Sequence, residues 1–398
     1  MSIFNKQKTY LVINLLLEIS LYIFPATLLF RWSHANAICV WIFVLYLTSL
    51  STGRSLPQFV SPLSLPVFLF LLAVFIPSII TIGLADTWRE GKHVLYSIGI
   101  FFIYVDQISR QPVILKRSLL SLMMFSTFLS LDSFFQWFTG KDIIGMELFG
   151  GRCTAVFVNP NYLCFFISGT IPVLFFHLQE TTNVWFKILD LLLLIFAYMT
   201  IMLAGAKTGF SVMVLFFIFY LVQEKKKEAW ALTALGLGTM VLFFYDPIGI
   251  KNRFLEFYLH GDDRWSLWMQ TYTVFIKPHQ LLGMGLDTFK AIYPAVKISG
   301  ISYSAPHNVY LEIWQTSGII ALCFFVYISF KTIALSMMQI RKQRIYVYLF
   351  ISIVMLFITS AVSIPVFSKY FSFYFWLYLG LFAGAMQIHP ATENSMGG

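Results

Sequence analysis

Charged residues are scarce in this chain: Asp, Glu, Lys and Arg make up 11% of its 398 residues, and hydrophobic residues make up 59%. Soluble domains carry about 25% charged residues, so this scarcity excludes an ordinary soluble domain. Most of the sequence consists of apolar runs, and a helix that spans a bilayer needs roughly 20 such residues. The runs do not alternate with a period of two, so each predicts a helix that satisfies its own backbone hydrogen bonds in lipid.

Cysteine motifs and nucleotide-binding motifs are also missing. The four cysteines are scattered and form no CxxC pair or Cys/His cluster, which excludes a disulfide framework and a zinc-type ligand set. Cys153 lies in a predicted outer loop, where its thiol could be oxidised. No GxGxxG sequence or P-loop occurs, so nothing indicates a bound nucleotide. We expect neither a metal nor another cofactor.

Acidic residues are fewer than basic ones, 18 against 27, which gives a net charge of +9. A basic excess of this kind would suit a nucleic-acid partner. Here, however, the lysines and arginines lie in the loops between apolar runs, where membrane orientation and anionic lipid account for them. The expected partners are therefore membrane lipids and not nucleic acid.

Twelve apolar runs predict an all-α integral membrane protein with about 12 transmembrane helices. The first run is too long for the apolar core of a signal peptide, so we expect it to be a signal-anchor. The runs are 10–30, 37–50, 62–84, 93–109, 118–137, 161–178, 185–204, 208–223, 229–245, 307–330, 345–364 and 370–388. With an inward N-terminus, the cytoplasmic loops hold about twice as many lysines and arginines as the short outer loops. By the positive-inside rule, both termini are then cytoplasmic.

One polar segment, residues 246–306, interrupts this pattern and predicts a large outer loop that contains short helices. It is rich in Trp, Tyr, Phe and Leu, so its composition is not that of a disordered linker. Loops longer than about 15 residues are usually functional or disordered. Within the loop, Asp262 and Asp263 predict the start of an amphipathic helix, suited to a membrane surface. Its apolar stripe consists of Trp265, Trp268, Met269, Tyr272 and Phe275.

Basic side chains gather at the predicted outer ends of the helices, although they are far apart in sequence. They are Arg152, Lys207, Arg264 and His307. Guanidinium groups bind phosphate oxygens in a bidentate manner and lysine adds a point charge, so such a cluster would suit a lipid-linked diphosphate and stabilise it as a leaving group. Arg152 and Arg264 could instead extend to lipid headgroups. Lys207 lies between two apolar runs, where an ionisable residue indicates function.

His307 follows a proline and opens a predicted helix. A histidine with its ordinary pKa of about 6.5 suits a general base, and neighbouring cations would keep it neutral. The alternative is an interfacial histidine that only packs. Amide side chains lie at the same level: Asn308 beside His307, and Asn159 and Asn161 in the NPN sequence before another helix. We expect these asparagines, with Arg152, to bind substrate.

Taken in order, three segments resemble the bacterial O-antigen ligase and polymerase family. GGRCTAVFVNPNYLCFFI resembles its arginine–glycine–NPN segment before a span, and RWSLWMQTYTVFIKPHQLLGMGLDTF resembles its arginine–tryptophan helix with a following proline–glycine turn. HNVYLEIWQTSGIIAL resembles its His-Asn segment, with Gly318 eleven residues after His307. The resemblance covers residues 145–335, which we expect to be the catalytic region between N-terminal helices (1–144) and two C-terminal helices (336–398).

The resemblance implies a GT-C-like glycosyltransferase of the bacterial inner membrane, with a periplasmic active site and no metal. It implies a donor glycan that is linked to undecaprenyl diphosphate. By position, His307 would activate the acceptor hydroxyl and Arg264 would bind the diphosphate. Lys207 stands where ligases usually carry an arginine in a Ser-Arg-Gly turn. Here the turn is Ala206-Lys207-Thr208, so the charge is kept without the bidentate fork.

The acceptor separates two interpretations that share this chemistry. An O-antigen ligase transfers the polysaccharide to the lipid A-core oligosaccharide, and a polymerase adds it to a growing lipid-linked glycan. A transporter of lipid-linked sugars is a third interpretation, which predicts ionisable pairs near the bilayer midplane and inverted repeats; here the polar groups gather at one face. We therefore expect a ligase, with His307, Arg264 and Lys207 as its catalytic residues.

Overall fold

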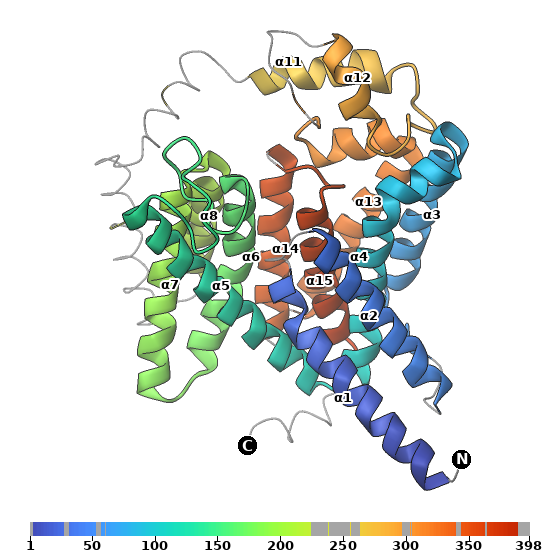
Figure 1. Ribbon diagram of the computed structural model, residues 1–398. Helices are drawn as coiled ribbons and strands as arrows, with labels where there is room; N and C mark the ends of the chain where they lie inside the picture. The colour runs from blue at the N-terminus through green and yellow to red at the C-terminus, as the bar shows by residue number, and fades with distance from the viewer. Residues whose placement is uncertain are drawn as a thin grey trace.

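The computed structural model describes residues 3–27, 32–52, 57–59, 61–223, 238, 255, 263–296, 303, 305–339, 344–362 and 364–388. This part of the chain is almost wholly helical, and its β pairing is limited to two isolated bridges. The helices, labelled as in Figure 1, are α1 (Ile3–Thr27), α2 (Trp32–Ser51), α3 (Ser64–Ile82), α4 (Leu84–Arg110), α5 (Val113–Thr139), α6 (Pro160–Glu180), α7 (Val184–Ala204), α8 (Lys207–Gln223), α11 (Asp263–Gln270), the π-helix η1 (Thr271–Ile276), α12 (Thr288–Val296), α13 (Val309–Gln339), α14 (Arg344–Val362) and α15 (Lys369–Ala385).

Helices coincide with eleven of the twelve predicted runs. The twelfth, 229–245, lies outside the described residues apart from Gly238. Seven of the described helices are long and apolar enough to cross a membrane, and three shorter ones are also apolar. The prediction of an all-helical integral membrane protein is therefore supported in its helical and apolar character, whereas the number of twelve spans and a GT-C-like arrangement stay predictions.

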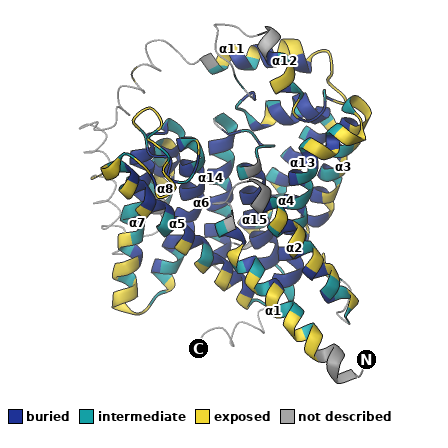
Figure 2. Cartoon of the chain, viewed as in Figure 1, coloured by how far each residue is buried: buried dark blue, intermediate teal, exposed yellow. Residues whose placement is uncertain are grey.

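Helix α15 lies at the centre of the bundle (Figure 1), and all of residues 371–385 are buried. It packs most extensively against α4. Small residues allow this close approach, since a Cβ at Gly380 would lie 3.2 Å from the Phe101 Cα. Figure 2 shows buried residues concentrated around α15 and exposed residues on peripheral helices such as α1 and α7. The exposed side chains of these outer helices include many large apolar ones, as a lipid-facing surface requires.

Short polar sequences set the helix ends that carry several candidate residues. The Asn159 side chain caps α6 by accepting a hydrogen bond from Asn161 N (2.8 Å), and Pro160 occupies the start of the helix. Gly205 adopts the left-handed conformation at the end of α7, which allows the chain to turn at once into α8 at Lys207. The NPN sequence and the turn before Lys207 thus place candidate residues at helix termini.

The segment from α11 to α12 lies across one end of the bundle, opposite the end at which α1 begins (Figure 1). It has a small core of its own, in which Leu267 and Phe275 pack with Phe289 and Tyr293. The rings of Phe289 and Tyr293 stack with their centroids 5.0 Å apart. The predicted short helices of the long loop are therefore present in its described part, where they cover the helix ends.

The predicted apolar stripe on α11 and η1 is divided between two faces. Phe275 is only 1% exposed, whereas Trp265 and Tyr272 are exposed. The buried face is built on Leu267, which lies on the same side of the helix as Phe275, two turns apart. The prediction of a single stripe is therefore wrong for Phe275, because packing against α12 selects a different face. The predicted capping residue Asp262 lies outside the described residues.

Helix α13 is interrupted at Gly318, where φ is 80° and ψ is 179°. At the interruption, backbone N–H and C=O groups of α13 form hydrogen bonds with the turn at residues 280–285 and not within the helix. The bonds are Met284 N to Gln315 O (2.8 Å), Gly285 N to Thr316 O (2.9 Å) and Ile319 N to Gln280 O (2.9 Å). In a low-dielectric setting, backbone groups without partners are costly. The interruption and the turn therefore depend on one another, and together they attach the α11–α12 segment to α13.

We predict that Gly318→Ala strongly destabilises the protein. A Cβ at residue 318 would lie 1.9 Å from the Leu281 O, and an L-residue is strained at this positive φ. The free energy of unfolding should fall by about 3 kcal/mol, measured by thermal unfolding in detergent. Gly145→Ala is the matched control, because Gly145 also has a positive φ but nothing lies within 4 Å of a Cβ there. Equal losses in both variants would contradict the role of the close contact.

Candidate functional site

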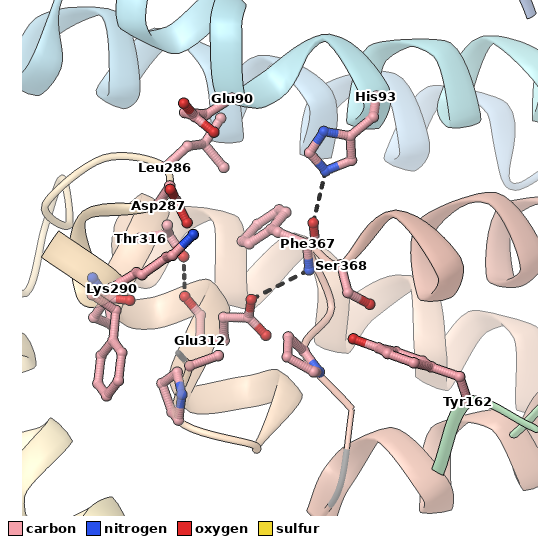
Figure 3. Close-up of a pocket in the computed structure, with 15 residues that line it drawn as sticks. Glu90, His93, Tyr162, Leu286, Asp287, Lys290, Glu312, Thr316, Phe367 and Ser368 are labelled. Carbon is pink, nitrogen blue, oxygen red and sulfur yellow. Dashed lines mark hydrogen bonds between the residues drawn. The ribbon is translucent and has the colours of Figure 1, made fainter. Parts of the chain in front are cut away.

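A cavity of about 320 Å³ lies where α4, α13, the start of α12 and the loop between α14 and α15 meet (Figure 3). Small-molecule sites have volumes of about 300–1,000 Å³, so the cavity is large enough for a small ligand. Its lining is unusual for an apolar helix bundle, because it is rich in ionisable side chains. These are Glu90, His93, Asp287, Lys290 and Glu312.

Glu312 forms the buried side of the cavity and holds the loop between α14 and α15. It is 6% exposed, and its carboxylate accepts hydrogen bonds from Val366 N (2.5 Å) and Phe367 N (3.4 Å). From α4, His93 Nε2 donates to Phe367 O (2.7 Å), since a carbonyl oxygen can only accept. Figure 3 shows the two side chains reaching this loop from opposite sides. The loop is thus fixed between α4 and α13.

Residues at the start of α12 form another wall. Asp287 has φ 59°, a left-handed conformation that Asp adopts more readily than most residues. Thr288 begins α12, and Gln315 Nε2 donates to its Oγ1 (3.1 Å), which attaches α12 to α13. Asp287 and Lys290 are both exposed and both line the cavity. A ligand that enters the cavity can therefore reach them.

His307 lies beside the cavity, directly after Pro306, which lines it. Its backbone has φ 54°, and uncommon conformations of this kind cluster at functional sites. Its ring packs against Tyr303, with centroids 5.8 Å apart. Asn308 caps α13, because its Oδ1 accepts hydrogen bonds from two backbone N–H groups of the first turn (3.0 and 3.1 Å). Asn308 thus has a structural role, and its substrate contact stays a prediction.

Arg264 lies on α11, one turn before Trp268 and on the same face of that helix. Trp268 Nε1 donates to Pro306 O (3.0 Å). The helix face that carries Arg264 is therefore docked against the turn that leads to His307. The structure brings these two predicted segments together, although all of η1 and α12 separate them in sequence.

The segments of Arg152 and Lys207 also lie side by side. Cys153 N donates to Leu203 O (3.0 Å) at the end of α7, just before the turn that leads to Lys207. The Arg152 guanidinium lies over the ring of Phe149, 5.5 Å from its centre. The segments that carry the four predicted basic residues thus form two neighbouring pairs. The segment of Arg152 lies beside that of Lys207, and the segment of Arg264 lies beside that of His307.

Cys153 itself is buried, with a relative exposure of 0%. Its Sγ donates to Ser133 O (3.3 Å), and burial raises the pKa of the thiol to about 12. Because the thiolate is the reactive form, these surroundings disfavour oxidation, and Cys153 is a buried packing residue.

The start of α6 borders the same cavity as the His307 turn. Asn159 and Asn161 flank the first residue of this helix, and Tyr162, the next residue, lines the cavity. The Asn159 side chain is engaged as the helix cap. The NPN turn and the Pro306–His307 turn, which both carry predicted residues, therefore approach one cavity from different elements.

The ionisable residues that line the cavity were not predicted as site residues. Glu312 had a usable signal, because it is an ionisable residue in the first turn of an apolar run. Asp287 and Lys290 follow the GMG turn, where polar residues are ordinary in a loop. His93 gave no signal, since its partner is the backbone of Phe367 and no local pattern reports such a distant contact.

The seven helices that are long and apolar enough to cross a membrane indicate an integral membrane protein. Residues 191–326 match the family model described as O-antigen ligase, which confirms the predicted resemblance to that family over this region. The matched region includes Lys207, Arg264, His307 and Glu312. Members of this family are glycosyltransferase-like enzymes, which implies lipid-linked glycan substrates. No curated protein matches the chain.

We predict that Glu312→Ala destabilises the protein by about 3 kcal/mol, because two buried N–H groups lose their acceptor and a void is left. Glu312→Gln keeps one acceptor oxygen and should lose about half as much. Thermal unfolding of the purified protein in detergent measures both. Glu147→Ala serves as the control, since Glu147 is exposed and paired only across the surface with Lys141 (3.4 Å). A wild-type midpoint for Glu312→Ala would show that the loop is held by other contacts.

Proposed function

We propose that this protein is an O-antigen ligase. It transfers a polysaccharide from undecaprenyl diphosphate to the lipid A-core oligosaccharide, at the periplasmic face of the bacterial inner membrane. The observation that carries the proposal is the family match over the region that contains Lys207, Arg264 and His307. The hydrogen bond from Trp268 to Pro306, which docks the Arg264 helix on the His307 turn, supports it.

In the proposed reaction, His307 accepts the proton of an acceptor hydroxyl. The acceptor oxygen then forms a bond to the anomeric carbon of the donor sugar, while the bond between that carbon and the diphosphate oxygen breaks. The electron pair of the broken bond leaves with undecaprenyl diphosphate. Arg264, Lys207 and Arg152 stabilise the negative charge that develops there, and preorganised cations at a site with little water do so most effectively. The proposed reaction is metal-independent.

The positions of the cations are consistent with a lipid-linked donor. Three of the four predicted basic residues lie at or beside helix ends, namely Arg264 on α11, His307 before α13 and Lys207 at the start of α8. Arg152 lies in the loop between α5 and α6. A diphosphate headgroup whose chain is in lipid has its charge at that level. A polymerase would use the same donor and the same residues, and differs only in its acceptor.

A deletion strain tests the proposal through its lipopolysaccharide profile. We expect loss of all polysaccharide-capped lipopolysaccharide, with lipid-linked polymer accumulating, and restoration by the wild-type gene. His307→Ala should fail to restore capping while the protein stays in the membrane at the wild-type level, because the base is lost. A core that carries a single repeat unit would indicate a polymerase instead. An active His307→Ala would refute the base, and an unchanged profile would argue against both activities.

The proposed role of Lys207 in binding phosphate is tested with two variants, one that keeps its positive charge and one that removes it. Lys207→Arg should retain or improve transfer, since it keeps the charge and adds the bidentate fork, whereas Lys207→Met should lose at least about tenfold in kcat/KM. Lys141→Met is the control at an exposed lysine of a neighbouring loop. An inactive Lys207→Arg combined with an active Lys207→Met would show that Lys207 does not bind phosphate.

A further inference from the structure

The cavity differs in charge from the cations proposed to bind the diphosphate. Three carboxyl groups line it, those of Glu90, Asp287 and Glu312, together with the basic side chains Lys290 and His93. Among the described residues, its lining includes neither the proposed arginine ligands nor the α8 lysine. The carboxylates of Glu90 and Asp287 repel a diphosphate. The cavity therefore disfavours the diphosphate and suits a neutral ligand.

All three carboxyl groups interact with neighbouring groups of the protein. Glu312 accepts hydrogen bonds from the backbone of the α14–α15 loop, and Glu90 Oε1 accepts one from Arg89 Nε (2.7 Å). Asp287 and Lys290 are the more exposed charged groups, and Figure 3 shows them on the same side of the cavity. These two side chains are the charged groups best placed to contact a ligand.

The neutral part of the lining combines hydrogen-bonding groups with aromatic rings. Hydroxyl and amide groups both donate and accept, a carboxylate only accepts and an ammonium only donates. A sugar residue needs this mixture, because each hydroxyl can donate one hydrogen bond and accept others while the ring presents an apolar face. The neutral side chains are those of Tyr162, Gln315, Thr316, Ser368, Phe289 and Phe367.

We infer that the cavity binds one neutral sugar residue, with the Asp287 carboxylate accepting hydrogen bonds from its hydroxyls and the Lys290 ammonium donating one. The inference rests on the proposed function and specifies which part of the substrates this site takes. The volume of about 320 Å³ suits a single sugar residue. Pro306 lines the cavity and directly precedes His307, so this wall adjoins the turn that carries the proposed base. The acceptor glycan and the donor glycan both offer such a residue.

Steady-state transfer by the purified full-length protein in liposomes tests the inference with Asp287→Asn and Lys290→Gln. Asn preserves the shape of the side chain and tolerates the positive φ. Loss of a hydrogen bond to a charged group should raise KM about tenfold for the glycan whose sugar occupies the cavity, with kcat changed less than about threefold. A raised KM for the acceptor assigns the acceptor's sugar, and a raised KM for the donor assigns the donor's. The control is Lys277→Gln, an exposed lysine that does not line the cavity.

Wild-type KM values for both substrates in both variants, with the wild-type protein active, would overturn the inference and leave the proposed function standing. No transfer by the wild-type protein would contradict the proposed function, and binding would then decide the inference. Protein in nanodiscs is titrated with delipidated core oligosaccharide and, separately, with sodium pyrophosphate. Saturable oligosaccharide binding that Asp287→Asn weakens about tenfold supports a sugar site. The same titration is made with delipidated donor polysaccharide. Failure of both glycans to bind, or pyrophosphate binding that Lys290→Gln abolishes, overturns it.

Discussion

The interruption of α13 at Gly318 is the feature on which the rest of the site depends. A helix in lipid normally satisfies its own backbone, yet here Gln315 O and Thr316 O accept hydrogen bonds from the turn at residues 280–285. This exchange of partners is possible because glycine alone can adopt the backbone conformation at 318 without contact against Leu281 O. The turn in turn fixes the start of α12, and with it Asp287 and Lys290. The interruption of α13 at Gly318 thus positions the turn at residues 280–285, which leads into α12.

The cavity and the segments that carry the predicted cations are distinct. Arg152, Lys207 and Arg264 do not line the cavity, whose charged groups are of both signs. In the proposed reaction, this separation would favour an orientation in which the charged end of the substrate lies outside the cavity. His307, on the turn between the α11 contact and the cavity wall, lies where the two environments meet.

Much of the helical framework could be predicted from the sequence, because apolar length and the scarcity of charge determine it. The resemblance of the three segments also identified the family that the match over residues 191–326 supports. The cavity could not be predicted, because its lining comes from α4, α6, α12, α13 and the α14–α15 loop, and only tertiary packing brings them together. Periodicity alone failed for Phe275, since it reports an apolar stripe without saying which side another helix will cover. The helix-capping roles of Asn159 and Asn308 could not be predicted either. An asparagine before a helix can cap that helix or bind a substrate, and the sequence does not distinguish the two.

Helix α15 is the centre of the bundle, and it follows every other described helix in the chain. During synthesis, α4 and the other helices enter the membrane before the helix against which they finally pack has left the ribosome. Until then, the surface of α4 around Phe101, which later accommodates Gly380, must face lipid or a temporary partner. The central helix of the bundle is therefore synthesised after α4, the helix against which it packs most extensively.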